Sequence, residues 1–481
     1  TVLRHVIGVS VLRWGDAFFS QNTYANHMAQ NGVFALVDTL RARSKTKKSD
    51  AWSRGLPFTN AVALTREFTL LPGETLVEPD KYPLLRRSPA AAALPLLKKP
   101  KHVVLVLMES FSARFCGATG AKFGATPHFD DLARHGILFD RTFSVSTHTA
   151  QGVFGTLCSF PNLPEFDGVM KHPLGNQSFR TIPTLMKESG FNVLFLYNGL
   201  YSWDNKEGFF RQQGVQRFIG RNDYVNPTFV DPDWGVCDFD VFVRAVEEFN
   251  VLAKTGKPFF GFVLTLSNHA PFNLPKVEGL EEIASGDEQY KRINGIHYAD
   301  WALGQFIQRA RQTEWFHDTL FVFAGDHGFG IPPVLTRAGL LHQHIPLLFY
   351  GPGVLGQTGE VRHVTASQID ILPSIHGILG LEAPHQSFGR NLFALPPGDP
   401  GHAYVKASGS PIVGLIEGNQ IVTVASGQSP VLQTFNLSFP PSASDDIAAQ
   451  QPERAAQMET RLKAFVQTGL KTLKDHRAGG D

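Results

Sequence analysis

Cysteine is scarce in this sequence, with three residues in a chain of 481. Cys116, Cys158 and Cys237 lie far apart and form no CxxC pair, so we expect no thiolate metal site. The odd count in a long chain gives no sign of a disulfide framework. The cysteine count does not indicate the cellular compartment, because a protein outside the cytoplasm can also lack disulfides.

An excess of charge of one sign is also missing. The chain has 44 basic and 43 acidic residues, for a formal net charge of +1. No global field would hold nucleic acid, so we expect no nucleic-acid partner. No apolar run reaches the ~18 residues that a membrane-spanning helix needs, and no secretory signal is visible. Because the chain begins at Thr1 rather than at methionine, we expect it to be part of a longer protein.

The composition is that of a folded globular protein. Apolar residues make up 43% of the chain and charged residues 18%. Phenylalanine is common, with 39 residues. Such an excess can indicate a surface that meets lipid, but a large aromatic core is the more frequent cause. We therefore expect most of these rings to be buried.

Three regions differ in their patterning. Residues 1–95 lack clear strand alternation and contain a helix-like spacing over 24–42, so we take them as an accessory segment. Residues 96–400 alternate short apolar runs with helical stretches, which predicts an α/β domain with a mostly parallel sheet. Residues 401–481 contain short runs broken by glycine and asparagine, which predict antiparallel strands, and then a helix over 452–474.

The central region carries the elements that would position a site. Its apolar runs show no polar alternation, as expected for strands covered on both faces. The predicted strands are 102–108, 191–197, 259–266, 319–325 and 345–351. The predicted helices are 126–136, 183–190, 298–312 and 368–381. We expect an α/β/α sandwich.

Polar residues follow four of these strands. In open α/β sheets, ligands bind beyond the carboxyl ends of the strands, so these residues should converge on one edge. They are Glu109 and Ser110, Asn198 and Gly199, Ser267 to His269, and Asp326 and His327.

Glu109, Asp326 and His327 offer oxygen and nitrogen atoms without sulfur. Such a set suits Mn²⁺, Mg²⁺ or Zn²⁺. Gly325 and Gly328 would permit the tight turn that lets both Asp326 and His327 reach one ion. An Asp-His-Gly tripeptide in a turn often has no function, so the residues alone leave a structural role open.

Thr149 is the candidate nucleophile. It lies in the stretch HTAQG, before a helix predicted to start near Gln151. It would be the N-cap, and a cap alone is a sufficient reason for a threonine there. In the functional interpretation, the helix N-terminus would stabilise a phosphoryl group, and a metal would lower the pKa of the hydroxyl.

Three histidines remain to be placed. His269, in LSNHAPF, could protonate a leaving oxygen, or it could simply cap its loop. His342 and His344 form an HxH pair, which would chelate an ion only if a strand already begins there. We do not expect that pair to be a metal site.

Several motifs together resemble a known family. In order they are VVLVLMESF, TPHFDDLARHGILFDRTFS, HTAQGVFGTLCSFP, LYNGLYSWDNKEGFFRQQGVQRFI, LSNHAPF and FAGDHG, spread over roughly residues 100–395. This ordered set resembles the sulfatase-like branch of the alkaline phosphatase superfamily. Within that branch it is most similar to lipoteichoic acid synthases and to periplasmic phosphoglycerol transferases that modify glucans.

The resemblance implies roles for individual residues. Glu109, Thr149, Asp326 and His327 would bind one divalent metal, with Mn²⁺ as the first choice and Mg²⁺ or Zn²⁺ as alternatives, and Thr149 would be the catalytic nucleophile. His269 would contact the substrate phosphate and the leaving group.

The resemblance also implies a substrate pocket. Trp203, Asp204 and Asn205 would line the head-group pocket. Members with Trp-Asn-Arg use the arginine on phosphate, and Asn205 stands in its place here.

The resemblance further implies an alkaline phosphatase-like fold, a phospholipid donor such as phosphatidylglycerol, and a carbohydrate or glucan acceptor. The enzyme domain would lie on the periplasmic or extracellular face of the cytoplasmic membrane, as the soluble part of a membrane protein. An N-terminal region absent from this chain would be the anchor, and residues 1–95 would be the juxtamembrane segment.

Other activities remain as alternatives. A sulfatase would need a Cys-x-Pro/Ala-x-Arg motif, which HTAQG lacks. Phosphoethanolamine transferases share the metal pattern but tend to carry several disulfides. A phosphodiesterase would pass the same group to water. A degenerate member would keep the fold as a binding module, but all four expected metal positions hold competent residues.

Overall fold

The structure is a computed structural model, and it describes residues 32, 52, 56–89, 94–283, 285–286, 288–356 and 358–479. Apart from Gly32, the helix predicted over 24–42 lies outside the described residues. Within the described part, no helix combines the length and the apolar composition that crossing a membrane would require.

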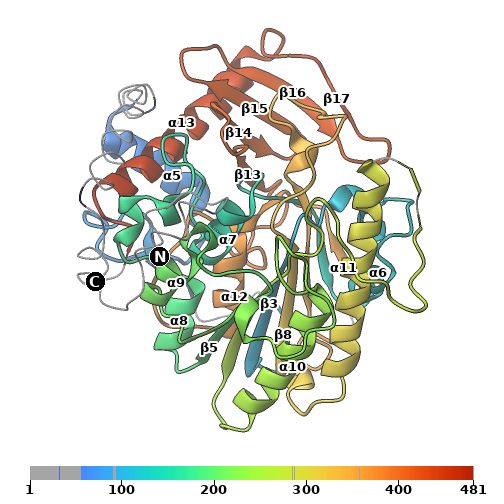
Figure 1. The fold of residues 1–481 in the computed structure, drawn as a ribbon. Helices are drawn as coiled ribbons and strands as arrows, with labels where there is room; N and C mark the ends of the chain where they lie inside the picture. The colour runs from blue at the N-terminus through green and yellow to red at the C-terminus, as the bar shows by residue number, and fades with distance from the viewer. Residues whose placement is uncertain are drawn as a thin grey trace.

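A nine-stranded sheet forms the centre of the molecule (Figure 1). Its main path runs in the order β10-β4-β9-β8-β3-β7-β5-β6, and β11 pairs with β4. The strands are β3 (His102–Met108), β4 (Ile137–Phe143), β5 (Asn192–Tyr197), β6 (Arg217–Ile219), β7 (Phe259–Leu264), β8 (Thr319–Gly325), β9 (His344–Tyr350), β10 (Glu360–Arg362) and β11 (Ala366–Ser367).

The sheet is mostly parallel, as predicted. β8, β3, β7, β5 and β6 pair in parallel with one another. β9 is the exception, since it pairs antiparallel with both β8 and β4. The carboxyl ends of β3, β5, β7 and β8 therefore lie along one edge, which is where the sequence places its polar residues.

Two helical layers cover the sheet. Side chains of β3 alternate between two cores: Val103 and Leu105 pack into one, and Val104 and Val106 into the other. The first core includes α7 (Thr149–Cys158), α8 (Ile182–Glu188), α9 (Lys206–Gln212) and α12 (Ile371–Leu379). The second includes α6 (Pro127–Ala133), α10 (Asp238–Ala253) and α11 (Glu288–Ala310), which lie on the other face in Figure 1. The predicted α/β/α sandwich is confirmed.

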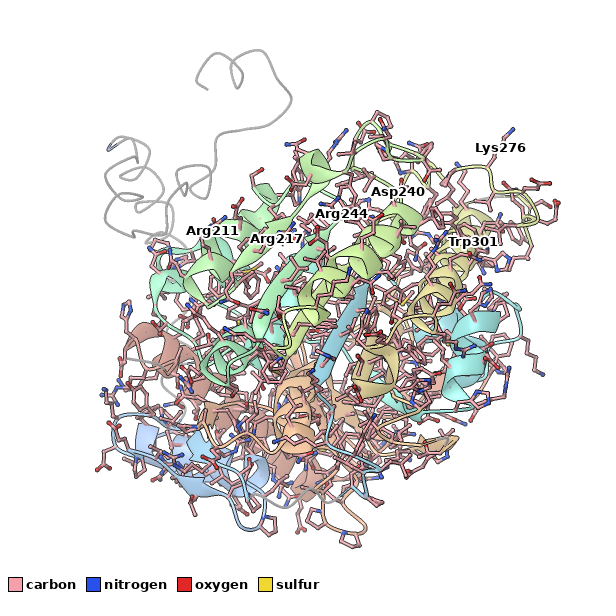
Figure 2. All side chains as sticks on the ribbon, turned by 90° about the horizontal axis from the view of Figure 1, so that it is seen from below. Arg211, Arg217, Asp240, Arg244, Lys276 and Trp301 are labelled. Carbon is pink, nitrogen blue, oxygen red and sulfur yellow. The ribbon has the colours of Figure 1, made fainter. Side chains whose placement is uncertain are left out.

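Charged side chains protect the edge strand β6. Arg217 of β6 and Arg244 of α10 both contact Glu248, at 2.9 Å to its Oε1. Figure 2 shows the two arginines near one another at this edge of the sheet. Charge on an edge strand disfavours pairing with a second sheet.

The C-terminal region forms a separate antiparallel sheet, again as predicted. Its strands, in order, are β13 (His402–Val405), β14 (Ile412–Glu417), β15 (Gln420–Ala425), β16 (Val431–Asn436) and β17 (Ser442–Ala443). Helix α13 (Pro452–Lys474) follows, with the predicted bounds, and packs against α5 (Phe58–Thr69) (Figure 1). The hydroxyls of Thr65 and Thr468 join these two helices at 2.9 Å.

A small sheet of β1 (Thr75–Leu76), β2 (Leu85–Arg87) and β12 (His385–Gln386) ties the N-terminal segment to the main domain. Such contacts do not test the predicted boundaries at residues 95 and 400, which stay predictions. α11 begins at Glu288 rather than near 298, because its polar first turns hide the helical spacing of the buried Ile293 and Ile296.

Candidate metal centre

The centre is built where β3 and β8 end side by side. The two strands pair in parallel, with Met108 opposite Gly325. Glu109 and Asp326, the next residue of each strand, therefore leave the sheet at the same level. Both side chains are buried, at 1% and 0% exposure. Strand register thus brings together two carboxylates that are far apart in the sequence.

Backbone donors hold Asp326 in place. Its Oδ1 accepts hydrogen bonds from the N–H groups of Ser110 and His327, both at 2.7 Å. Ser110 adopts a positive φ of 49°, which turns its N–H toward this carboxylate. The other oxygen, Oδ2, is buried without a hydrogen-bond partner in the described structure. Burial, followed by the charge of Glu109, raises the pKa of Asp326 to about 7.

Glu109 joins the candidate nucleophile to the centre. Its Oε1 accepts the Ser110 hydroxyl at 2.7 Å, and its Oε2 accepts the Thr149 hydroxyl at 3.0 Å. Thr149 comes from α7, on the first-core face of the sheet. Two layers of the sandwich therefore meet at this glutamate.

His327 presents one ring nitrogen to the carboxylates. Its Nδ1 lies 2.8 Å from the Gly328 carbonyl, which it can only approach as a donor. Nε2 is then the acceptor, 3.6 Å from Asp326 Oδ2 and 3.8 Å from Glu109 Oε1. Burial lowers the pKa of His327, but the charges of Asp326 and Glu109 outweigh it and raise that pKa above its ordinary value.

These residues fit a divalent metal. Donor atoms from Glu109, Asp326 and His327 lie within 4.8 Å of one another. Two buried carboxylates repel each other unless a cation neutralises them, and Asp326 Oδ2 has no other partner to satisfy it. Oxygen and imidazole donors suit Mn²⁺, Mg²⁺ or Zn²⁺. The three cysteines are buried and free.

Helix α7 carries Thr149, but its cap differs from the prediction. The helix starts at Thr149, and His148 is the N-cap, with Nδ1 accepting from the Ala150 N–H at 3.2 Å. Thr149 is thus not the N-cap residue, and its hydroxyl donates a hydrogen bond to Glu109. The sequence could not separate the two residues, because histidine is a less common cap than threonine.

A glycine seats this helix against the metal centre. A Cβ on Gly152 would lie 2.5 Å from the Asp326 carbonyl oxygen, so only glycine permits this approach. The same carbonyl accepts from Gln368 Nε2 at 2.9 Å. Gly152 on one side of this carbonyl and Gln368 on the other therefore set how close α7 lies to the end of β8.

His269 is not among the ligand atoms that gather at the centre. Its ring packs against Trp234 at a tilt of 46°, with centroids 3.8 Å apart, and Trp234 meets Trp203 edge to face at 6.0 Å. Nδ1 of His269 is held by the Ala270 carbonyl at 2.8 Å, which leaves Nε2 for a ligand. Trp234 links two predicted substrate residues. No local pattern marks Trp234, because it comes from a loop rich in proline and aspartate.

The other two predicted pocket residues are buried. Asn205 donates from Nδ2 to the Met170 carbonyl at 2.7 Å, so its amide supports a neighbouring turn. Asp204 contacts Lys171 Nζ at 2.6 Å and lies 3.8 Å from Lys206 Nζ. Neither lysine was a sequence candidate.

The HxH pair is not a chelating pair. His342 lies in a 3-10 turn, and β9 begins at His344. His344 Nε2 donates to the Asp140 carbonyl at 2.7 Å. The His342 ring instead lies against His327, with centroids 5.9 Å apart. This agrees with the expectation from the sequence.

Curated proteins similar in sequence include lipoteichoic acid synthases and phosphoglycerol transferases. The lipoteichoic acid synthase-like YvgJ of Bacillus subtilis is 22% identical over 316 residues, which cover 62% of this chain and 50% of that protein. Phosphoglycerol transferase I of Salmonella paratyphi B is 22% identical over 211 residues, covering 42% and 28%. The chain spans about half the length, or less, of these relatives.

Solved structures show the same fold. A Vibrio parahaemolyticus protein of the alkaline phosphatase superfamily superposes with a TM-score of 0.78 and 26% identity, covering 90% of this chain and 100% of that one. The lipoteichoic acid synthase LtaP of Listeria monocytogenes gives 0.67 at 16% identity, over 87% and 99%. Residues 101–381 match the family described as Sulfatase. The chain therefore belongs to the sulfatase family, within the alkaline phosphatase superfamily.

Proposed function

We propose that the chain is a metal-dependent phosphoglycerol transferase. It would take the head group of a phosphatidylglycerol-like lipid and pass it on through a covalent phospho-threonine intermediate. One observation carries this proposal: the Thr149 hydroxyl donates to Glu109, 3.0 Å away, inside a buried group of two carboxylates and an imidazole. The names of the similar curated proteins support the choice of phosphoglycerol.

Glu109, Asp326, His327 and the Thr149 oxygen would hold the ion. A divalent metal there would lower the pKa of the Thr149 hydroxyl and neutralise charge on the phosphoryl oxygens. Mn²⁺ is our first choice, and Mg²⁺ and Zn²⁺ fit the same donors. His327 binds through Nε2, because the Gly328 carbonyl fixes the proton on Nδ1.

The first step forms the intermediate. Thr149 Oγ attacks the lipid phosphorus, and its proton leaves along the hydrogen bond toward Glu109 Oε2. The bond between phosphorus and the diacylglycerol oxygen breaks. His269 Nε2, once protonated, gives its proton to that oxygen, so diacylglycerol leaves as the neutral alcohol. The glycerophosphoryl group is then bound to Thr149.

The second step releases the group. An acceptor hydroxyl attacks the phosphorus, and its proton returns to His269. The phosphorus–Oγ bond breaks, and Thr149 regains its proton. A carbohydrate or glucan hydroxyl would make the enzyme a transferase, and water would make it a phosphodiesterase. Trp203 and Trp234 offer aromatic faces against which a sugar ring or a glycerol can pack.

We place this activity at a phospholipid surface on the periplasmic or extracellular side. The second candidate, phosphoethanolamine transfer, uses the same metal residues and differs only in the head group. The absence of a thiol from position 149 argues against sulfatase chemistry, since a threonine cannot become formylglycine.

The test measures diacylglycerol released from phosphatidylglycerol vesicles in the presence of Mn²⁺. We expect turnover by the parent and a loss of at least about a thousandfold in Thr149→Ala, because the covalent route is closed. Thr149→Ser keeps a hydroxyl and should retain part of the activity. Equal turnover by Thr149→Ala at saturating Mn²⁺ would show that the threonine is not the nucleophile.

A further inference from the structure

Two side chains from different loops share one hydrogen-bond acceptor. The Ala270 carbonyl oxygen lies 2.8 Å from His269 Nδ1, and it accepts the Trp234 Nε1–H at 2.9 Å. A carbonyl oxygen has two lone pairs and no proton, so it can accept from both rings, and each of the two nitrogens must carry a proton. The indole and the imidazole are therefore held by the same atom.

The two rings also pack against each other. Their centroids are 3.8 Å apart at a tilt of 46°, and both side chains are half-buried. Trp203 meets the indole edge to face at 6.0 Å. An imidazole that turned about its Cβ–Cγ bond would lose its hydrogen bond to Ala270 and part of its contact with the indole. Trp234 therefore restricts the rotation of the His269 ring.

A short loop holds Trp234 in this place. Asp231 Oδ1 accepts the Trp234 N–H at 2.9 Å, and the Asp231 N–H donates to the Gly235 carbonyl at 2.7 Å. The Val236 N–H donates to the carbonyl of Asn198, the residue that follows β5, at 3.0 Å. A Cβ on Gly235 would lie 1.9 Å from that same carbonyl oxygen, so the loop lies directly on the sheet edge. The indole thus has a fixed position relative to the sheet.

The turn that carries His269 is tied to the metal centre through its neighbour. The buried Asn268 donates from Nδ2 to the carbonyls of Glu109 and Ser110, at 3.1 and 3.3 Å. These bonds fix the backbone of the turn relative to Glu109, but they do not involve the imidazole. The orientation of the imidazole therefore depends on the contacts that the ring itself makes.

The tautomer of His269 decides what it can do in the proposed reaction. With one proton held on Nδ1 by the Ala270 carbonyl, Nε2 is the nitrogen that exchanges protons. In the first step, protonated Nε2 gives its proton to the diacylglycerol oxygen as the bond from that oxygen to phosphorus breaks. In the second step, the lone pair of Nε2 takes the proton of the acceptor hydroxyl. The opposite neutral tautomer has no lone pair at Nε2 and cannot act as this base.

We infer that Trp234 is a positioning residue, which holds His269 in the ring orientation and the tautomer that proton transfer at Nε2 requires. The indole ring supports the imidazole, and the indole N–H keeps the Ala270 carbonyl directed at Nδ1. This inference rests on the proposed function. It assigns a role to a residue that neither binds the metal nor carries the transferred group.

The kinetic test compares two leaving groups in the first turnover with Mn²⁺. Phosphatidylglycerol releases the diacylglycerol oxygen, which needs a proton, whereas glyceryl 4-nitrophenyl phosphate releases 4-nitrophenolate, which needs none. Trp234→Ala should slow the release of diacylglycerol by about a hundredfold and the release of 4-nitrophenolate by less than about threefold. Trp234→Phe keeps an aromatic ring and should recover part of the lost rate.

Trp315→Phe is the matched control. This buried tryptophan donates its Nε1–H to Asn250 Oδ1 at 2.8 Å, near the amino end of β8, so the variant loses an indole hydrogen bond away from the metal centre. The ratio of its two rates should equal that of the parent. A Trp234→Ala variant that slows both leaving groups equally, or slows neither, overturns the inference. Trp234→Leu replaces the alanine variant if that variant does not fold.

A second readout needs no turnover. In Mg²⁺-loaded protein labelled with ¹⁵N-histidine, the chemical shifts of the ring nitrogens report which nitrogen of neutral His269 carries the proton, and His269→Gln assigns the signals. We expect the proton on Nδ1 in the parent and a mixture of tautomers in Trp234→Ala. A parent without a proton on Nδ1, or an alanine variant that keeps the single tautomer of the parent, overturns the inference. If the parent cleaves neither ester, the proposed function fails, and this readout still decides whether Trp234 positions His269.

Discussion

Glu109 and Asp326 are acidic side chains that the fold buries next to each other. Without a cation they repel, and this repulsion contributes to the raised pKa of Asp326. Ser110 and His327 donate backbone N–H groups to one oxygen only, which leaves the second oxygen for an ion. A centre of this kind is less stable empty than filled.

A residue-scale prediction follows for Asp326→Asn. The amide oxygen can still accept both N–H groups, so the metal-free variant should fold. Adding Mn²⁺ to chelator-treated parent should stabilise it by about 2.7 kcal/mol at one hundred times the Kd, since the ion binds only the folded state. Asp326→Asn should gain little stability from added Mn²⁺.

Thermal unfolding with and without Mn²⁺ measures this difference. Asp318→Asn is the matched control, because Asp318 precedes the other end of β8 and its side chain is 40% exposed. A variant that responds to Mn²⁺ as the parent does would exclude Asp326 from the metal site.

Sequence reasoning found the residues of the centre whose positions follow from strand ends. Glu109, Asp326 and His327 come together because parallel neighbours end at one level. Sequence reasoning missed Lys171, Lys206 and Trp234, because turns and loops set the positions of these residues. Their positions depend on φ angles and tertiary contacts that no local pattern encodes.

At the scale of elements, we expect the contact between α7 and the end of β8 to be the part of the site that tolerates least change. Gly152 lets the helix approach the Asp326 carbonyl, and Gln368 holds that carbonyl from the other side. Thr149 and Asp326 therefore keep a fixed separation. A displacement of ~1 Å in such a geometry can cost about a hundredfold in rate.

We predict that Gly152→Ala separates the helix from the strand end. The new Cβ would lie 2.5 Å from backbone, which cannot rotate away. Metal affinity and lipid turnover should both fall by about tenfold or more, while circular dichroism keeps its helical signal.

Gly155→Ala gives the comparison, since its Cβ would meet the Val145 side chain rather than the Asp326 backbone. It should lose about 1–3 kcal/mol of stability through overpacking but keep more of its metal affinity. Equal metal affinity in Gly152→Ala and the parent would show that helix seating does not set the site.

The strands of the main sheet were the most predictable elements. β3 and β8 match their predicted bounds, because each is a continuous apolar run, the pattern typical of a parallel strand that is buried on both faces. The edge of the C-terminal sheet was less predictable. β16 buries only Leu432 and Phe435 and so carries too weak an alternation to be recognised.

Across the whole molecule, the aromatic content serves the core. Among the described phenylalanines, only Phe439 belongs to the exposed large hydrophobic residues. This supports the prediction of a large aromatic core. Buried histidines lie within the same interior and couple its stability to pH.

His344 and His376 are two such histidines. Burial lowers the pKa of each from 6.5 to about 4, so both are neutral in the folded state near pH 5, where the unfolded chain binds protons. The folded state keeps both histidines neutral, which costs nothing above pH 6.5. As the pH falls from 6.5 to about 4, the unfolded chain binds the protons that the folded state does not, and the folded state loses stability. Between these values the free energy of unfolding should fall by about 1.4 kcal/mol per pH unit for each histidine.

Urea unfolding of the metal-free protein between pH 7 and pH 5 measures this slope. The glutamine in His344→Gln cannot titrate, so the slope of the unfolding free energy against pH should fall by about the contribution of one histidine. His363→Gln is the control, because that side chain is 75% exposed. A slope that is the same in His344→Gln and the parent would contradict the assignment.

The most direct test of the account is the covalent state of Thr149. The metal-loaded protein is mixed with phosphatidylglycerol, quenched rapidly in acid, and analysed by intact mass and peptide mapping, with Thr149→Ala alongside. We predict a glycerophosphoryl adduct on the peptide that contains Thr149 and none on the variant. An adduct on another residue, or steady turnover by the parent without any adduct across the quench series, would contradict the central claim.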